Sequence, residues 1–151
     1  MSITIRDATP NDLPVIIGFQ LRMAKETENL TLDIATVTRG AQEVFKDPSK
    51  GKYYLAEQSG QVMGCLLTTF EWSEWRDGNV LWVQSVFIDE KYRGQGVFRK
   101  MYRHVQALVS SDPGLKGIRL YVDKRNAEAQ QVYQKLGMNS DHYLIYEWMK
   151  D

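Results

Sequence analysis

The sequence predicts a mixed α/β fold, in which helices pack against a central sheet of parallel and antiparallel strands. Apolar residues recur with a period of two in some segments and of about 3.6 in others, the periods of half-buried strands and amphipathic helices. The two kinds of segment alternate along the chain without an internal repeat or a linker. Residues 81–88 are almost wholly apolar or β-branched, which is typical of a central strand covered on both faces.

A strand, two helices and a β-hairpin are predicted in the first half of the chain. The first helix has a start signal, because Thr9 can cap it and Pro10 fits its first position. Asp47-Pro48-Ser49 ends the second helix, and Ser59-Gly60 forms the tight turn of the hairpin. The predicted strands are residues 3–6, 53–58 and 62–72, and the predicted helices start at Thr9 and near Asp33.

Three strands and two helices are predicted in the second half, after a loop at residues 72–79 that is rich in Trp, Glu and Gly. Asp112-Pro113-Gly114 ends the first of these helices, and Gly137 ends the second. The predicted strands are residues 81–88, 118–122 and 142–149, and the predicted helices are residues 97–109 and 126–136. The whole order is β-α-α-β-β-β-α-β-α-β.

Length and charge narrow the class of protein. The 151 residues fit one domain, residues 1–151. The 19 basic residues balance 19 acidic ones, whereas general nucleic-acid binding needs a basic excess, so we expect no nucleic-acid partner. No apolar stretch approaches the roughly 18 residues of a membrane span, so we expect no membrane association. The single cysteine, Cys65, cannot form an internal disulfide, which indicates a cytoplasmic location.

The segment from Glu90 to Lys100 joins the central strand to a helix and contains Gly94 and Gly96. Glycines at such a place let the backbone turn tightly, so that successive N–H groups point at one anion, and the helix start adds a partial positive charge. Residues 91–111 hold five bases and no acid, which leaves 14 bases and 19 acids, a net charge of −5, elsewhere. The pattern predicts an anion-binding loop, although a basic helix face after an ordinary glycine turn explains it equally well.

Two familiar glycine motifs do not fit this loop. A P-loop needs Gly-Lys-Ser/Thr, and a dinucleotide fingerprint needs a third glycine where the chain has Arg99. Instead, Arg93-Gly94-Gln95-Gly96-Val97-Phe98 resembles the Q/R-x-x-G-x-G/A signature of the GNAT superfamily of acyl-CoA-dependent N-acetyltransferases. Residues 126–138, Asn-Ala-Glu-Ala-Gln-Gln-Val-Tyr-Gln-Lys-Leu-Gly-Met, are similar to a second block of that family, N-x-x-A-x-x-x-Y-x-x-x-G-F.

The resemblance covers nearly the whole chain, because the order of elements from Ile3 to Met149 also agrees with that family. It implies a GNAT-like mixed sheet whose strands splay apart around acetyl-CoA. Two residues depart from the pattern: Phe98 stands where the signature has Gly or Ala, and Met138 replaces a Phe. The Phe98 amide still donates, but its ring must turn away from the phosphates or lie over them.

The resemblance implies how acetyl-CoA would be held. The pyrophosphate would lie on the backbone amides of residues 93–98, with Arg99 adding charge. The pantetheine arm would pair with the backbone of Val86, Phe87 and Ile88, and Asn126 would hydrogen-bond a pantetheine amide. No metal site is expected, because His104 and His142 are far apart in the sequence without metal-ligand spacing, and Cys65 alone cannot form a thiolate cluster.

Tyr133 is the expected catalytic acid, placed at the sulfur of the cosubstrate. When an amine attacks the thioester, the departing CoA thiolate needs a proton, and a phenol with a pKa near ~10 can supply it. Position 133 also lies on the apolar stripe of its helix, where a Tyr can be core. The match of Asn126 and Gly137 to the family favours the catalytic interpretation.

Glu71 is the expected general base, because the attacking amine must lose a proton. Glu74 and Asp77 are weaker candidates, and a solvated acidic loop is the alternative for all three. The aromatic side chains nearby, together with acids at the end of the first helix, are suited to a cationic amine, although hydrophobic packing with a polar rim explains any one of them equally well. These residues are Trp72, Trp75, Trp82, Glu26 and Glu28.

The sequence therefore predicts an N-acetyltransferase that moves acetyl from acetyl-CoA directly to a primary amine in a ternary complex. The acceptor would be a small-molecule or peptide amine, and a homodimer is compatible with the family. The alternative is a non-catalytic acyl-CoA-binding sensor or partner-binding module that keeps only the cofactor cradle. Tyr133 favours the enzyme, whereas Phe98 leaves room for the sensor.

Overall fold

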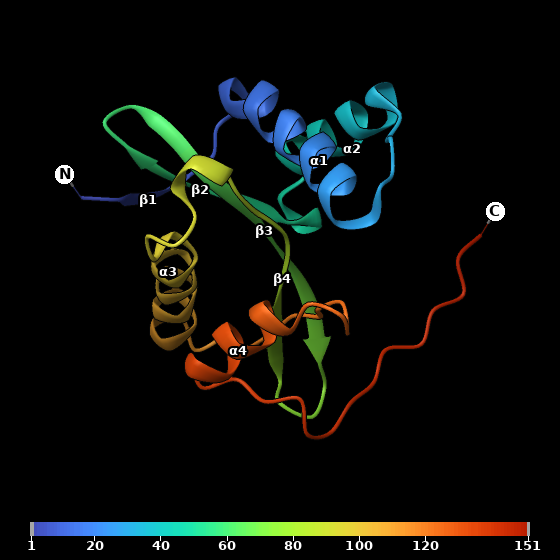
Figure 1. Ribbon diagram of the computed structural model, residues 1–151. Coiled ribbons are helices and arrows are strands. Elements are labelled where there is room, and N and C mark those ends of the chain that lie inside the picture. The colour runs from blue at the N-terminus through green and yellow to red at the C-terminus, as the bar shows by residue number, and fades with distance from the viewer. Residues whose placement is uncertain (1, 151) are drawn as a thin grey trace. The chain divides into compact units, whose positions relative to one another are not determined.

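A five-stranded sheet in the order β1-β2-β3-β4-β5 lies at the centre of the first of two compact units (Figure 1). The computed structural model describes residues 2–150, and the units are Met1–Arg119 and Leu120–Asp151. The strands are β1 Thr4–Asp7, β2 Lys52–Gln58, β3 Gln61–Ser73, β4 Gly78–Ile88 and β5 Leu115–Arg119. The helices are α1 Leu13–Glu28, α2 Ile34–Lys46 and α3 Val97–Ser111 in the first unit, and α4 Ala127–Lys135 in the second.

The sheet is mixed, as the sequence predicts. Strands β1 to β4 pair antiparallel with their neighbours, whereas β5 runs parallel to β4 after the chain has crossed over through α3. The loop that begins α3 therefore follows the carboxyl end of β4. In α/β units this end of a strand is where ligands bind.

Helices cover both faces of the sheet: α1 and α2 lie on one face and α3 on the other (Figure 1). Because side chains alternate along a strand, Leu55 of β2 faces the core cluster that includes Ile16 and Phe19 of α1. The neighbouring residue Tyr54 faces α3, where its ring lies 5.5 Å from that of His104. The two faces thus have separate hydrophobic contacts.

The helix starts agree with the sequence signals. Thr9 and Asp12 form a capping box before α1, in which the Thr9 amide donates to Asp12 Oδ2 at 2.7 Å. Asp33 caps α2, because its Oδ2 accepts from the Thr36 amide at 3.0 Å. Among residues 2–150, no helix combines the length and the apolar character that crossing a bilayer requires.

Two predicted strands differ from the structure. The strand predicted at 118–122 is β5, which starts three residues earlier because pairing of Leu115 with Asn79 begins directly after the turn at Asp112. The strand predicted at 142–149 is absent: residues 143–150 form no regular structure, and Tyr146 and Trp148 are about 90% exposed. The segment has the composition of a strand, but a strand forms only when its backbone pairs with a neighbour.

Candidate active site

The loop from Arg93 to Gly96 leaves the carboxyl end of β4 and leads into α3. Gly94 and Gly96 have φ values of 78° and 77°, the left-handed region that glycine adopts at little cost. Gly96 caps α3, and the first bond inside the helix runs from the Lys100 amide to the Gly96 carbonyl at 3.1 Å. The amides of residues 97–99 precede that bond, so they have no acceptor within the helix.

These amides and the helix dipole make this turn suited to an anion, as the motif predicts. The side chain of Val97 is buried and anchors the helix start, whereas residues 93–96 and Arg99 are exposed. The donor set is backbone N–H with a cationic side chain nearby, which fits a pyrophosphate. We define residues 93–98 as the phosphate loop.

Phe98, the departure from the family pattern, directs its ring along the helix. Its centroid lies 6.3 Å from that of Tyr102, one turn further along α3, at an interplanar angle of 36°. The backbone N–H points parallel to the helix axis, whereas the ring lies on the side of the helix that positions 98 and 102 share. The large side chain at position 98 is therefore compatible with anion binding by the amide.

Arg93 does not direct its charge toward the loop amides. Its Nη1 and Nη2 donate to the two carboxylate oxygens of Glu26 in α1 at 2.8 and 3.0 Å. Its Nε donates to the carbonyl of Ile88 at 2.9 Å. The pair holds the pKa of Glu26 below its usual value, mainly through the hydrogen bond from Arg93. Glu26, expected near the acceptor, is thus bound to the phosphate loop.

Strand β4 contains a β-bulge where the pantetheine arm is expected. Cys65 pairs with Phe87 and Leu67 with Gln84, so Ser85 and Val86 lie opposite the single residue between them. Ser85 has a φ of 54°, unusual for a residue other than glycine. Sequence reasoning missed the bulge. Its one signal is the polar Gln84-Ser85 pair inside an otherwise apolar strand.

Cys65, a residue of the hydrophobic core, forms a hydrogen bond with the bulge. This thiol is fully buried, donates to the Ser85 carbonyl at 3.7 Å and accepts from Gln20 Nε2 of α1 at 3.8 Å. Burial raises its pKa to about 12, so it is a thiol and not a nucleophilic thiolate at neutral pH. Cys65 is therefore part of the packing and also links α1 to the bulge by hydrogen bonds.

Beyond the bulge, one edge of β4 is open within the first unit. The ladder with β5 ends at the pair Trp82–Arg119, so residues 83–88 extend past it on that side. The Phe87 side chain is 4% exposed and belongs to the core, which leaves its backbone as the part that a ligand would meet. An extended amide-containing chain has the hydrogen-bonding pattern to pair with such an edge.

Glu71 lies in a polar cluster formed across β3, β4 and β5. Its Oε1 accepts from Trp82 Nε1 and its Oε2 from Arg119 Nη1, each at 2.7 Å. These contacts, the indole first, lower the pKa of Glu71 although partial burial opposes them. Beside it, Gln84 Nε2 donates to Thr69 Oγ1 at 2.8 Å. The cluster presents an ionised carboxylate at neutral pH.

Arg119 is a site residue that the sequence did not reveal, because its position opposite Trp82 depends on the register of a parallel strand pair. Trp72, by contrast, is not beside Glu71: as the next residue in β3 it points to the opposite face, and it is 62% exposed. Trp75 is 88% exposed in the turn that joins β3 to β4. Of the three predicted aromatic residues, the structure brings Trp82 to Glu71.

The second unit carries the remaining predicted residues on α4. Asn126 caps this helix, because its Oδ1 accepts from the Ala129 amide at 3.0 Å, so its NH₂ group is the part that would donate to a ligand. Tyr133 is half-buried near the end of the helix, and this burial raises its pKa. Gly137 follows in the left-handed conformation, with φ at 91°. The Asn126–Gly137 block thus folds as a capped helix.

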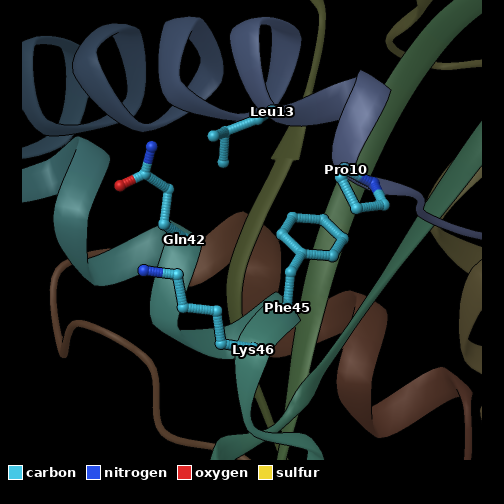
Figure 2. Close-up of a pocket in the computed structure, with 5 residues that line it drawn as sticks. All are labelled: Pro10, Leu13, Gln42, Phe45 and Lys46. Atoms are coloured by element: carbon cyan, nitrogen blue, oxygen red, sulfur yellow. The ribbon is translucent and has the colours of Figure 1, made fainter.

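A hollow between the start of α1 and α2 is lined by none of the predicted site residues. Pro10, Leu13 and Phe45 give it apolar walls, and Gln42 and Lys46 lie beside them (Figure 2). Among residues 2–150, no three His, Cys, Asp or Glu side chains gather as metal ligands would. The hollow thus offers mainly apolar contacts. The groups that could bind or react with a substrate lie in the phosphate loop, along the β4 edge, in the Glu71 cluster and on α4.

The sequence model of the acetyltransferase (GNAT) family matches residues 21–138. The chain belongs to this family. The match confirms the resemblance noted from the two sequence blocks. Enzymes of the family take the acetyl group from acetyl-CoA, which agrees with the anion-binding geometry of the loop.

Individual relatives support the same assignment. A solved structure of a possible acetyltransferase from Clostridium difficile 630 is 37% identical, with a TM-score of 0.92 over 100% of this chain and 99% of that one. The spermine/spermidine N(1)-acetyltransferase of Bacillus subtilis is 26% identical over 99% of this chain and 96% of that enzyme. Thialysine N-epsilon-acetyltransferase of Bos taurus is 34% identical over 50% of this chain, and the match spans 44% of that enzyme's length.

Proposed function

We propose that this GNAT acetyltransferase transfers the acetyl group of acetyl-CoA to the nitrogen of a primary amine by direct attack in a ternary complex. The observation that carries the proposal is the phosphate loop, in which the left-handed glycines Gly94 and Gly96 form a tight turn from the end of β4 into the start of α3. The family match and the named N-acetyltransferases among its relatives support it.

The chain's own groups suit each part of the donor. The amides of residues 93–98 would bind the pyrophosphate, with Arg99 nearby at the exposed first turn of α3. The backbone of Val86, Phe87 and Ile88, past the end of the β5 ladder, would pair with the pantetheine arm. Asn126 would donate its NH₂ hydrogens to a pantetheine amide, since its oxygen caps α4.

Tyr133 would act as the general acid. A neutral amine nitrogen forms a bond to the acetyl carbon, the carbon–sulfur bond breaks, and the thiolate that leaves takes the phenolic proton. Burial raises the pKa of Tyr133, so the phenol holds this proton at neutral pH. The proton lost by the acetylated nitrogen would leave toward a base and then to solvent.

Glu71 would serve the acceptor side. Its lowered pKa makes it an ionised carboxylate that attracts a cationic amine, and a weak base that takes a proton through water. Arg119 on its second oxygen disfavours another cation at the same point. We therefore expect one ammonium group beside Glu71, with any further charge of the acceptor placed away from Arg119. We also propose a cytoplasmic setting, because Cys65, the single cysteine, cannot form an internal disulfide.

The test is release of free thiol from acetyl-CoA across a panel of amines that includes polyamines, amino acids, aminoglycosides and peptides. Wild-type protein is expected to release thiol with at least one amine, and CoA is expected to raise its melting temperature. Tyr133→Phe should keep the CoA stabilisation and lose about 100-fold in kcat, the lower end for general acid catalysis. Unchanged kcat in that variant removes Tyr133 as the acid.

A non-catalytic acyl-CoA sensor is the competing function, and the same panel separates the two. Stabilisation by CoA without amine-dependent thiol release, for every amine, identifies the sensor. A lack of stabilisation by CoA contradicts both functions. An acidic or neutral acceptor that outperforms every amine contradicts the proposed substrate class.

A further inference from the structure

Four charged side chains join α1 to the chain that follows β4. Arg22 Nη1 and Nη2 each lie 3.4 Å from a carboxylate oxygen of Asp89, and Arg93 binds both oxygens of Glu26 at 2.8 and 3.0 Å. Arg22 and Glu26 are four residues apart on α1, so they share one helix face. We call Arg22, Glu26, Asp89 and Arg93 the charge quartet. Its two positive and two negative charges form two ion pairs and sum to zero.

The two arginines of the quartet pack against the ring of Phe87. The guanidinium carbons of Arg22 and Arg93 lie 5.1 and 5.3 Å from the ring centroid of Phe87, the penultimate residue of β4. That ring packs 5.2 Å from the ring of Phe19 in α1. Cation–π contacts of this kind add to the ion pairs, because the flat guanidinium groups cover the aromatic ring. The helix and the end of the strand are thus joined by both polar and aromatic contacts.

Arg93 uses all three of its nitrogens in this arrangement. Two bind Glu26 and the third donates to the carbonyl of Ile88, so the guanidinium faces α1 and β4. In this pair the Glu26 carboxylate neutralises the charge of the guanidinium, and three of its five N–H groups are used, which makes Arg93 a weaker ligand for a phosphate than an unpaired arginine. Arg93 is nevertheless the residue next to Gly94, where the loop begins its left-handed turn.

Resting on the proposed function, we propose that Arg93 is a positioning residue that acts through Glu26 to fix the phosphate loop for the donor. Gly94 and Gly96 give the loop its shape, but glycine also lets an unrestrained chain adopt many others. The bidentate pair holds the residue before the first glycine against α1 and keeps the loop amides convergent. The Arg93 side chain thus increases donor affinity through α1, without itself contacting the pyrophosphate.

The first experiment measures the loop directly, in the free protein. Hydrogen exchange of amides in residues 94–99 is compared between wild type and Glu26→Gln. Loss of an exposed bidentate pair is expected to speed exchange about three- to fivefold, the range of the strongest exposed ion pairs. Lys50→Gln is the matched control, because it removes another exposed ion pair, in which Lys50 Nζ lies 3.1 Å from Asp47 Oδ2. This pair is distant from residues 94–99 in the sequence, so exchange of their amides should not change.

The second experiment is a double-mutant cycle on CoA affinity with Arg93→Gln, Glu26→Gln and the double variant. If Arg93 acts through Glu26, each single change weakens CoA binding about three- to fivefold and the double variant is no weaker than either. Arg93→Lys, which keeps the charge but loses the bidentate geometry, should behave like Arg93→Gln. In steady-state kinetics the acetyl-CoA KM rises while kcat and the acceptor KM stay within twofold.

Two outcomes overturn this inference while the proposed function stands. One is additivity in the cycle, or tighter CoA binding in Glu26→Gln, because either shows Arg93 contacting the phosphates independently. The other is unchanged hydrogen exchange with wild-type CoA affinity in both single variants. If wild-type protein binds no CoA, the proposed function and the donor role both fail, whereas faster exchange in Glu26→Gln still shows that the pair restrains the loop.

Discussion

The proposed donor and acceptor sides of the first unit are built in different ways. The phosphate loop offers backbone N–H groups whose direction is set by Gly94 and Gly96. The acceptor side offers side chains, Glu71 with its two donors, that meet across three strands. Backbone distortion should therefore damage donor binding severely, whereas single side-chain changes on the sheet should alter the acceptor alone. Variants on each side test that contrast, from the largest expected effect to the smallest.

Gly96→Val should have the largest effect. A side chain at a φ of 77° costs about 1–2 kcal/mol in the left-handed region, and more for a β-branched residue, so the backbone will rotate away. The loop amides then no longer converge, and we expect CoA affinity to fall at least tenfold, measured by calorimetry. A Cβ at this position meets no atom within 4 Å, so a steric clash is not the cause.

Gly60→Val is the matched control for that variant. Gly60 lies in the turn between β2 and β3 with a φ of 76° and also has open space around it. It should lower the melting temperature as much as Gly96→Val does, yet leave CoA affinity unchanged. Equal loss of affinity in both variants means that the phosphate loop is not the donor site.

Glu71→Gln should have the next largest effect, on the acceptor. Loss of a charged hydrogen bond to an ammonium group weakens binding by about 1.5–3 kcal/mol, so the acceptor KM should rise at least tenfold. The acetyl-CoA KM should not change, because the phosphate loop lies on a different part of the unit. The kcat–pH profile should lose its acid limb. An unchanged profile removes Glu71 as the base.

The contrast also explains what the sequence could predict. A glycine spacing acts on the backbone locally, so Gly94 and Gly96 predict the tight turn before α3, and the resemblance to the family signature adds the expectation that this turn binds phosphates. The order of hydrophobic periods likewise predicts the mixed sheet. Arg119, the bulge at Ser85 and the bond from Arg93 to Glu26 depend on register or on contacts about 67 residues apart in the chain, which no local pattern encodes. The strand predicted at 142–149 is absent for the same reason, since composition does not supply a neighbouring strand.

Trp82→Phe should have a smaller effect than Glu71→Gln, and it also acts on the Glu71 carboxylate. The indole N–H is the main cause of the low Glu71 pKa, so its loss raises that pKa toward the usual value. Above the unfolded pKa of Glu, 4.5, the carboxylate's contacts stabilise the fold, and this contribution is lost as pH falls through the folded pKa. As the pH falls, the variant should therefore lose the stabilisation by the Glu71 carboxylate at a higher pH than wild type does. Melting temperatures measured from pH 3 to 6 test this change, and Glu71→Gln should lack this part of the pH dependence, because glutamine has no carboxyl group to protonate.

Phe98→Ala should have the smallest effect, although it alters the residue that departs most from the family signature. The Phe98 ring packs toward Tyr102 while the amide points to the helix start, so removing the ring leaves the donor in place. We expect CoA affinity to stay within twofold, and stability to fall by up to about 2 kcal/mol from lost packing of a half-buried ring. A tenfold gain in CoA affinity would show instead that the ring obstructs the phosphates, and that this part of the donor side depends on a side chain after all.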